Sequence, residues 1–98
     1  MKGISTSVVI PTYNRINYLV NELDSVLHQT YRNFEVIIVD NFSNDGTKEY
    51  IEGLKNSKIQ FYQIKNEGVI AKSRNFGVSK SNGKYIAFLD SDDRWNKE

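Results

Sequence analysis

The chain has 98 residues, which is enough for one domain at most. Its 13 Lys and Arg nearly balance its 12 Asp and Glu, so it has no net field that would favour nucleic acid or an acidic membrane surface. The absence of cysteine excludes disulfides, thiolate metal sites and cysteine nucleophiles. The start does not resemble a secretory signal, and no apolar run approaches the ~20 residues of a membrane span. We therefore expect a cytoplasmic protein, with attachment to the cytoplasmic face of a membrane left open.

The first half of the chain alternates between strand and helix patterns. Residues 7–11 form a continuous β-branched run that ends in proline, which is typical of a strand buried on both faces. Asn17 is a candidate N-cap for an amphipathic helix that runs to about Gln29. Residues 34–40 give the strongest strand pattern in the chain.

The second half continues the alternation. Ser43 or Asp45 is a candidate cap for the next helix, which ends near residues 55–57. The remaining elements are a strand at 58–64, a weakly patterned helix at 69–80 whose apolar positions are Ile70 and Val78, and a strand at 85–89. The order βαβαβαβ predicts an α/β fold: a three-layer αβα, Rossmann-like arrangement with a parallel sheet of about four strands.

Polar residues follow three of the predicted strands: Pro11-Thr12-Tyr13-Asn14-Arg15, Asp40-Asn41 and Asp90-Ser91-Asp92-Asp93. Because parallel strands end at one edge of a sheet, we expect these groups to converge on a single ligand-binding rim. The chain has neither a Gly-x-Gly-x-x-Gly nor a Walker A loop, so a dinucleotide oxidoreductase or phosphate-loop ATPase is disfavoured.

Three carboxylates, those of Asp90, Asp92 and Asp93, fall within four positions. Like charges so close repel one another, and a divalent cation removes that cost. Hard oxygen ligands suit Mn²⁺ or Mg²⁺, which commonly bridge carboxylates to substrate phosphates. The alternative is a solvated turn that caps a helix; the position after a fully apolar strand favours the metal site.

The other candidate ligand groups each have a structural alternative. The Asp40 carboxylate can accept a hydrogen bond from the N–H of a nucleobase, or it can cap a turn. Tyr13 can stack on a base, or it can cover the edge of the core. The guanidinium groups of Arg15 and Arg74 suit diphosphate oxygens, although each arginine by itself is more typical of a surface residue.

The ordered set of motifs resembles glycosyltransferase family 2, the large inverting family with the GT-A fold. The resemblance spans nearly the whole chain and rests on residues 8–15, 25–31, 34–40, 43–47, 66–68, 73–77, 83–89 and 90–95. It implies that residues 1–98 are the nucleotide-sugar-binding N-terminal part of such an enzyme. It also implies a nucleotide-diphospho-sugar donor, usually UDP-linked, a glycan or lipid-linked acceptor, Mn²⁺ or Mg²⁺, and a role in cell-surface polysaccharide synthesis.

The resemblance also suggests roles for individual residues. The tip from Pro11 to Tyr13, together with Asp40, would hold the nucleoside, and Arg74 would lie near the diphosphate. Asp90 would face the ribose or sugar, and Asp92 the metal, with Asp93 as a further possible ligand. The sequence departs from the family pattern at Asn41, where a second aspartate is usual, and at Phe42, where a small residue is common.

The family's catalytic base belongs to an acceptor-binding part that would lie beyond Glu98. We therefore expect no catalytic residue within these 98 residues, and little or no transferase activity from them alone. Three alternatives stay open: a non-catalytic nucleotide-binding module, a phosphoacceptor signalling domain with Asp40 as its acceptor, and an interaction fragment. The last would self-associate through an unpaired edge at the fourth strand.

Overall fold

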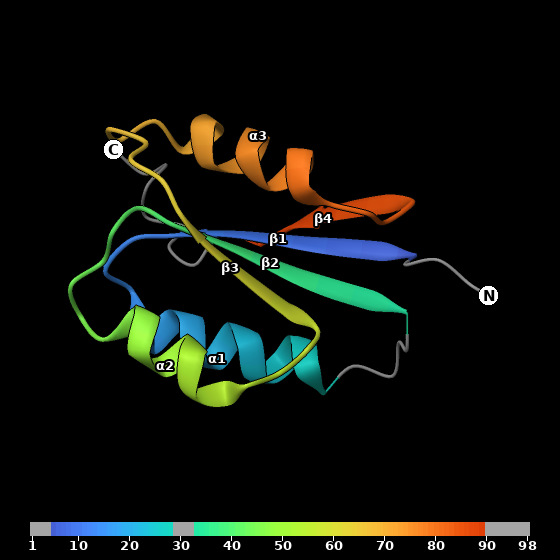
Figure 1. The fold of residues 1–98 in the computed structure, drawn as a ribbon, viewed down its shortest axis with the longest axis horizontal. Helices are drawn as coiled ribbons and strands as arrows, with labels where there is room; N and C mark the ends of the chain where they lie inside the picture. The colour runs from blue at the N-terminus through green and yellow to red at the C-terminus, as the bar shows by residue number, and fades with distance from the viewer. Residues whose placement is uncertain (1–4, 29–32, 90–98) are drawn as a thin grey trace.

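The computed structural model describes residues 5–28 and 33–89, and in them strands and helices alternate (Figure 1). The strands are β1 (Thr6–Thr12), β2 (Phe34–Asp40), β3 (Ile59–Gln63) and β4 (Tyr85–Phe88), and the helices are α1 (Ile16–Leu27), α2 (Thr47–Leu54) and α3 (Ile70–Lys80). The predicted βαβαβαβ order is confirmed.

The strands form one parallel sheet in the order β3-β2-β1-β4. Helices α1 and α2 cover one face of the sheet and α3 covers the other, which gives three layers (Figure 1). This confirms the predicted Rossmann-like architecture. Strands β2 and β3 are added in turn on one side of β1, and β4 is then added on the other side of β1. The strand order therefore reverses between β1 and β4, which is where ligands bind in open α/β sheets.

Two apolar clusters hold the layers together, one on each face of the sheet. On the α1 and α2 side, alternate residues of β1 and β2 pack with Leu19, Leu23 and Ile51. On the α3 side the buried cluster is smaller and consists of Val9, Ile37 and Val39. Because residues from 7 to 12 and from 34 to 40 are all buried, β1 and β2 are buried on both faces, as their continuous apolar runs predict.

Helix α3 lies close to the sheet because the residues that it buries are small. Its buried residues are Ser73 and Gly77, whereas Val78 is exposed. A Cβ atom at Gly77 would overlap Cγ1 of Val9. The predicted apolar face of Ile70 and Val78 is therefore wrong at Val78, since close approach of backbone to sheet selects small side chains rather than large apolar ones.

The predicted helix caps are also wrong. Helix α1 begins at Ile16 with Arg15 as N-cap and without a side-chain cap, so Asn17 falls inside the first turn. Helix α2 has Gly46 as its N-cap, with φ of 93°. Asp45 instead accepts a hydrogen bond from Ile16 N–H at 3.0 Å, so it satisfies a free donor of a helix distant in sequence.

At the amino ends of the strands, a buried carboxylate connects the turn before β4 to the sheet. Glu35 on β2 accepts hydrogen bonds from Ser7 Oγ at 2.6 Å, Gln60 Nε2 at 2.9 Å and Asn82 N–H at 2.6 Å. Gly83 N–H donates to Ser7 Oγ at 2.8 Å. A buried carboxylate is tolerated where several donors replace its water, and this network fixes where β4 begins.

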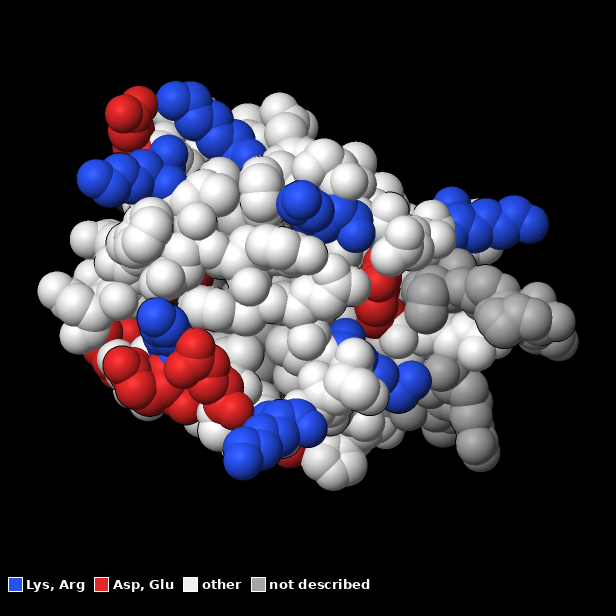
Figure 2. Space-filling model, viewed as in Figure 1, with Lys and Arg blue, Asp and Glu red and all other residues white. Residues whose placement is uncertain are grey.

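Figure 2 shows acidic and basic side chains interspersed over one face, with no single broad patch of either sign. This distribution agrees with the near-neutral composition. In the part of the chain that the structure describes, none of the helices combines the length and the apolar character needed to cross a bilayer.

Candidate functional site

The carboxyl ends of the parallel strands form one rim, as predicted. In register, Thr12 at the end of β1 lies beside Asp40 at the end of β2, and Asp40 lies beside Gln63 at the end of β3. Strand β4 runs parallel to β1, and Leu89 N–H donates to Val9 O at 3.0 Å. Tyr13 and Asp40 therefore project from the same end of the sheet. The predicted ligands Asp90, Asp92 and Asp93 lie outside the described residues.

The first two loops of the rim are joined by hydrogen bonds. Asn14 N–H donates to Ser43 Oγ at 2.7 Å, and Asn44 N–H donates to Asn14 Oδ1 at 2.8 Å. Asn14 and Phe42 have positive φ, at 48° and 55°. Non-glycine residues in this conformation are held against a backbone cost, which is common at binding sites. The loops therefore form one rigid unit.

Asp45 completes this connection between the two loops. Burial acts to raise the pKa of its carboxyl, but hydrogen bonds from the Thr47 hydroxyl and from the backbone N–H of Ile16 outweigh burial. The pKa of Asp45 is consequently below its usual value of 3.8. The carboxylate stays ionised near neutral pH and stabilises both loops.

Asp40 is fully buried beneath this pair of loops. Its carboxylate accepts hydrogen bonds from Ser43 N–H at 2.9 Å, from the Ser43 hydroxyl and from Gln63 Nε2 at 3.1 Å. A carboxylate has about four acceptor positions, so three of them are already used within the protein. The structure thus gives Asp40 the turn-organising role that was the alternative for this residue.

The third loop is organised by Asn66, which is buried. Its side-chain oxygen accepts Gly68 N–H at 2.9 Å, and its side-chain nitrogen donates to Ser73 Oγ at 2.8 Å. Its backbone N–H donates to Asn41 Oδ1 at 3.0 Å. Gly68 has φ of 81°, a conformation that glycine adopts without strain. The loop that opens α3 is thereby attached to the end of β2.

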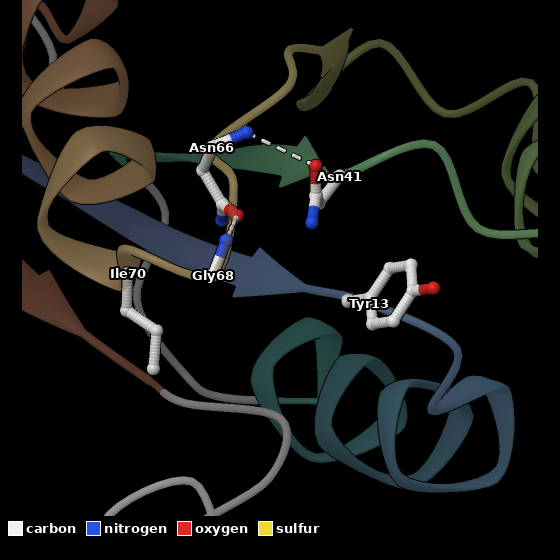
Figure 3. A pocket seen from close by; sticks show the side chains of 5 residues that line it. All are labelled: Tyr13, Asn41, Asn66, Gly68 and Ile70. Carbon is white, nitrogen blue, oxygen red and sulfur yellow. Dashed lines mark hydrogen bonds between the residues drawn. The ribbon is translucent and has the colours of Figure 1, made fainter.

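A cavity of about 380 Å³ opens at this rim, between the loops and the start of α3. Figure 3 shows its lining: the Tyr13 ring lies on one side and Ile70 on the other, with Gly68 and the side chains of Asn41 and Asn66 between these two. Tyr13 is 42% exposed, so its ring is accessible rather than part of the core. An aromatic ring opposite an apolar side chain, with amide groups above, suits a flat ligand with polar edges.

The structure brings only part of the predicted set into this cavity. Tyr13 lines it, whereas Pro11, Thr12 and Asp40 are buried behind it. Arg15 lines a second cavity of about 370 Å³ beside the start of α1. Arg74, half-buried on α3, places its guanidinium carbon 5.8 Å from the centre of the Phe88 ring.

Two lining residues had no individual role predicted for them. Asn41 was expected at the rim only as part of the polar strand end Asp40-Asn41, and Asn66 appeared only within the motif at residues 66–68. The backbone N–H of Asn66 donates to Asn41 Oδ1, a contact between residues 25 positions apart that no local pattern reveals. The polar character of the strand end was the one available signal.

Residues 7–98 match the family described as Glycosyl transferase family 2. The chain belongs to this family.

Curated relatives agree with the family membership. A glycosyltransferase of Rickettsia bellii is 50% identical over 94 residues, which is 95% of this chain and 14% of the relative. The amylovoran biosynthesis glycosyltransferase AmsB of Erwinia amylovora is 40% identical over 102 aligned positions, gaps included, which cover all of this chain and 34% of the relative. This family 2 chain therefore spans between about a seventh and a third of the length of these relatives.

Two solved structures share the fold of this chain. S. aureus TarS 1-349 in complex with UDP-GlcNAc matches with a TM-score of 0.83 at 34% identity, over 90% of this chain and 26% of TarS. A mannosyltransferase from Pyrobaculum calidifontis matches with a TM-score of 0.81 at 22% identity, over 94% of this chain and 28% of that protein, and bears on the fold alone. The observed sheet is thus the N-terminal, Rossmann-like part of a GT-A fold.

Proposed function

We propose that residues 1–98 form the donor-binding part of a glycosyltransferase. This enzyme transfers a sugar from a nucleotide-diphospho-sugar, in our proposal a UDP-sugar, to an acceptor hydroxyl with inversion at the anomeric carbon. The observation that carries the proposal is the cavity at the carboxyl rim of a family 2 sheet, with the accessible Tyr13 ring in it. The 34% identical TarS, which has been crystallised with UDP-GlcNAc, supports the choice of a UDP-linked donor.

The described residues supply binding and orientation in this proposal. The Tyr13 ring stacks on the base, and the hydrogen bonds between the loops hold that ring in place before the ligand arrives. Preorganised loops reduce the entropy lost on binding. Arg74 on α3 contacts the diphosphate in this proposal, which is supported by the position of its guanidinium beside β4, where the strand order reverses.

The metal site in this proposal is Asp92 and Asp93, with Asp90 toward the ribose or sugar. The donor set fits, because these carboxylates follow directly in sequence from β4, whose carboxyl end belongs to the same rim as Tyr13. Carboxylate oxygens suit Mn²⁺ and Mg²⁺. Such an ion, when bound, would offset the charge of the departing diphosphate. The general base belongs to sequence after Glu98 in our proposal.

The test is calorimetric titration of the chain with UDP, with and without Mn²⁺. We expect Mn²⁺ to strengthen UDP binding and Asp92→Ala to remove the strengthening. We expect Tyr13→Ala to weaken UDP binding by roughly 5- to 150-fold, the range for loss of one base–aromatic stack. Binding that is indifferent to Mn²⁺ and to Asp92→Ala would favour a nucleotide-binding module without metal-dependent transfer. Failure to bind UDP at all would reject the donor site.

A further inference from the structure

One buried carboxylate, at the amino ends of the strands, connects three strands of the sheet with the turn that leads into the fourth. Glu35 lies on β2, and its side chain accepts hydrogen bonds from Ser7 on β1, from Gln60 on β3 and from Asn82 N–H before β4. The Asn82 side-chain amide adds a fourth donor at 3.3 Å. Two donors face each oxygen, so the four acceptor positions of the carboxylate are all used. The proposed donor site, at the opposite end of the sheet, gives this group no direct role.

Strand β4 has little burial to fix its position along β1. It lies at one edge of the described sheet, it is four residues long, and all four residues are exposed. Leu89, directly after the strand, is the one residue from 85 to 89 that is partly buried. The buried face of a strand normally sets its register, and a strand without such a face is prone to slip along its partner. Hydrogen bonds at the start of β4 are therefore the main constraint on the observed register, which pairs Thr6 with Tyr85.

The turn before β4 supplies this constraint. Asn82 N–H donates to Glu35 at 2.6 Å, and the next N–H along the chain, that of Gly83, donates to Ser7 Oγ at 2.8 Å. A Cβ atom at Gly83 would lie 2.6 Å from the backbone nitrogen of Ser7, so the turn contacts the backbone of β1 directly. Two consecutive N–H groups are thus bonded to fixed partners, and β4 cannot move along β1 while both bonds persist.

We propose that Glu35 is a positioning residue for the opposite end of the sheet: by fixing the register of β4, it fixes where Asp90 and Asp92 reach the rim. This inference rests on the proposed function, which assigns those carboxylates to the donor and the metal. A slip that keeps the faces of β4 moves the strand by two residues, or about 7 Å. Metal–oxygen bonds are only roughly 2 Å long. Such a slip therefore separates the acidic residues from a nucleotide that is held at Tyr13.

Two variants release the turn in different ways. Glu35→Met keeps the length of the side chain but removes every acceptor of the network. Gly83→Ala keeps the carboxylate and pushes the turn away from the backbone of β1. Gln60→Met is the matched control, because it makes the same replacement at a side chain that bonds the same carboxylate from β3, on the side away from β4. Circular dichroism verifies that each variant is folded, and if Glu35→Met does not fold, Gly83→Ala decides.

The first measurement reads the register directly and requires no ligand. The chain has no cysteine, so a pair introduced by substitution forms the one possible disulfide within a molecule. Thr6→Cys with Tyr85→Cys joins partners of the observed register, whereas Thr6→Cys with Ala87→Cys joins residues that meet only after a two-residue slip. We expect the wild-type background and the control to oxidise the first pair selectively. We expect the two variants that release the turn to lose this selectivity.

The second measurement is the Kd of UDP with and without Mn²⁺. We expect the two variants that release the turn to bind UDP without Mn²⁺ as wild type does, because Tyr13 and its loop contacts are unchanged. We expect them to lose the strengthening by Mn²⁺, which Gln60→Met should keep. A general loss of stability would weaken binding under both conditions. Selective loss of the Mn²⁺ effect therefore indicates a positioning role.

The outcomes separate this inference from the proposed function. The inference requires both changes, so variants that alter the register without the Mn²⁺ effect, or the Mn²⁺ effect without the register, overturn it. If Glu35→Met and Gly83→Ala alter neither, Glu35 contributes to stability alone and the donor site stands. If wild type binds UDP without any effect of Mn²⁺, the metal site of the proposed function fails, and the inference fails with it.

Discussion

Asp45 shows how one carboxylate can hold two loops of the rim. It accepts Ile16 N–H at the start of α1 and the Thr47 hydroxyl at the start of α2, although neither helix uses it as an N-cap. We expect Asp45→Asn to lower the free energy of unfolding by about 1 kcal/mol near neutral pH, the usual net value of a lost hydrogen bond. Urea unfolding followed by circular dichroism measures the difference.

The pH dependence of this effect has a definite sign. The pKa of Asp45 is lower in the folded protein than its ordinary value of 3.8, so the unfolded chain binds the proton more readily. The stabilisation is thus complete above about pH 4 and is lost as the pH falls through the folded pKa. We expect the difference between wild type and Asp45→Asn to shrink in that range. Glu52→Gln, at an exposed position of α2, should show no comparable change. If the difference in free energy of unfolding between wild type and Asp45→Asn stays constant on acidification, the lowered pKa of Asp45 is contradicted.

At the residue scale, the sequence predicted which strand ends are polar, and it placed Tyr13 at the rim. It could not assign the roles of Asp40 and Asn41, because the orientation of each side chain depends on hydrogen bonds to residues in other loops. Asp40 meets Ser43 and Gln63, whereas Asn41 meets Asn66. The family resemblance names Asp40 among the residues that would hold the nucleoside, and that role stays a prediction.

At the element scale, two glycines within helices are predicted to respond in opposite ways to alanine. A Cβ at Gly77 of α3 would overlap Val9, whereas one at Gly53 of α2 meets no atom within 4 Å. We expect Gly77→Ala to destabilise the protein by about 1–3 kcal/mol through overpacking, and Gly53→Ala to stabilise it by about 0.5–1 kcal/mol through helix propensity. Chemical denaturation of both variants provides the comparison.

The double variant Val9→Ala/Gly77→Ala separates overpacking from other causes. Removing the Val9 methyl groups makes room for the new Cβ, so the double variant should be less destabilised than the sum of its two single changes. If the two effects simply add, α3 does not approach β1 as closely as described. Equal responses at Gly53 and Gly77 would lead to the same conclusion.

The sequence located these elements better than their contacts. Apolar runs and alternation predicted every strand to within about one residue at each end, because periodicity and composition are local properties. The face of α3 was mispredicted, since Ser73 and Gly77 carry no apolar signal and become contact residues only through the approach of the sheet. The caps failed for the same reason: the group that satisfies Ile16 belongs to another loop.

At the scale of the whole molecule, strand and helix alternation predicted a parallel sheet and a common rim, and both are confirmed. Alternation alone does not fix the order β3-β2-β1-β4, because each new strand can add on either side of those already placed. What places β4 beside β1 is tertiary: the Glu35 network holds the turn at Asn82, and Gly83 packs against the backbone of Ser7.

This order leaves β4 at one edge of the described sheet, with apolar side chains exposed. Tyr85 is 64% exposed, Ile86 37% and Phe88 46%, and the outer backbone groups of β4 pair with no described strand. An open apolar edge promotes strand pairing between molecules.

We therefore expect the 98-residue chain to associate as its concentration rises, which sedimentation velocity from low micromolar to submillimolar protein detects. Ile86→Lys places a charge on the edge and should keep the chain monomeric. Phe42→Lys, at another exposed apolar residue that lies on a rim loop, should associate like wild type. A wild-type chain that remains monomeric throughout would show that the β4 edge is protected, and an effect of equal size from both lysines would attribute association to net charge rather than to β4.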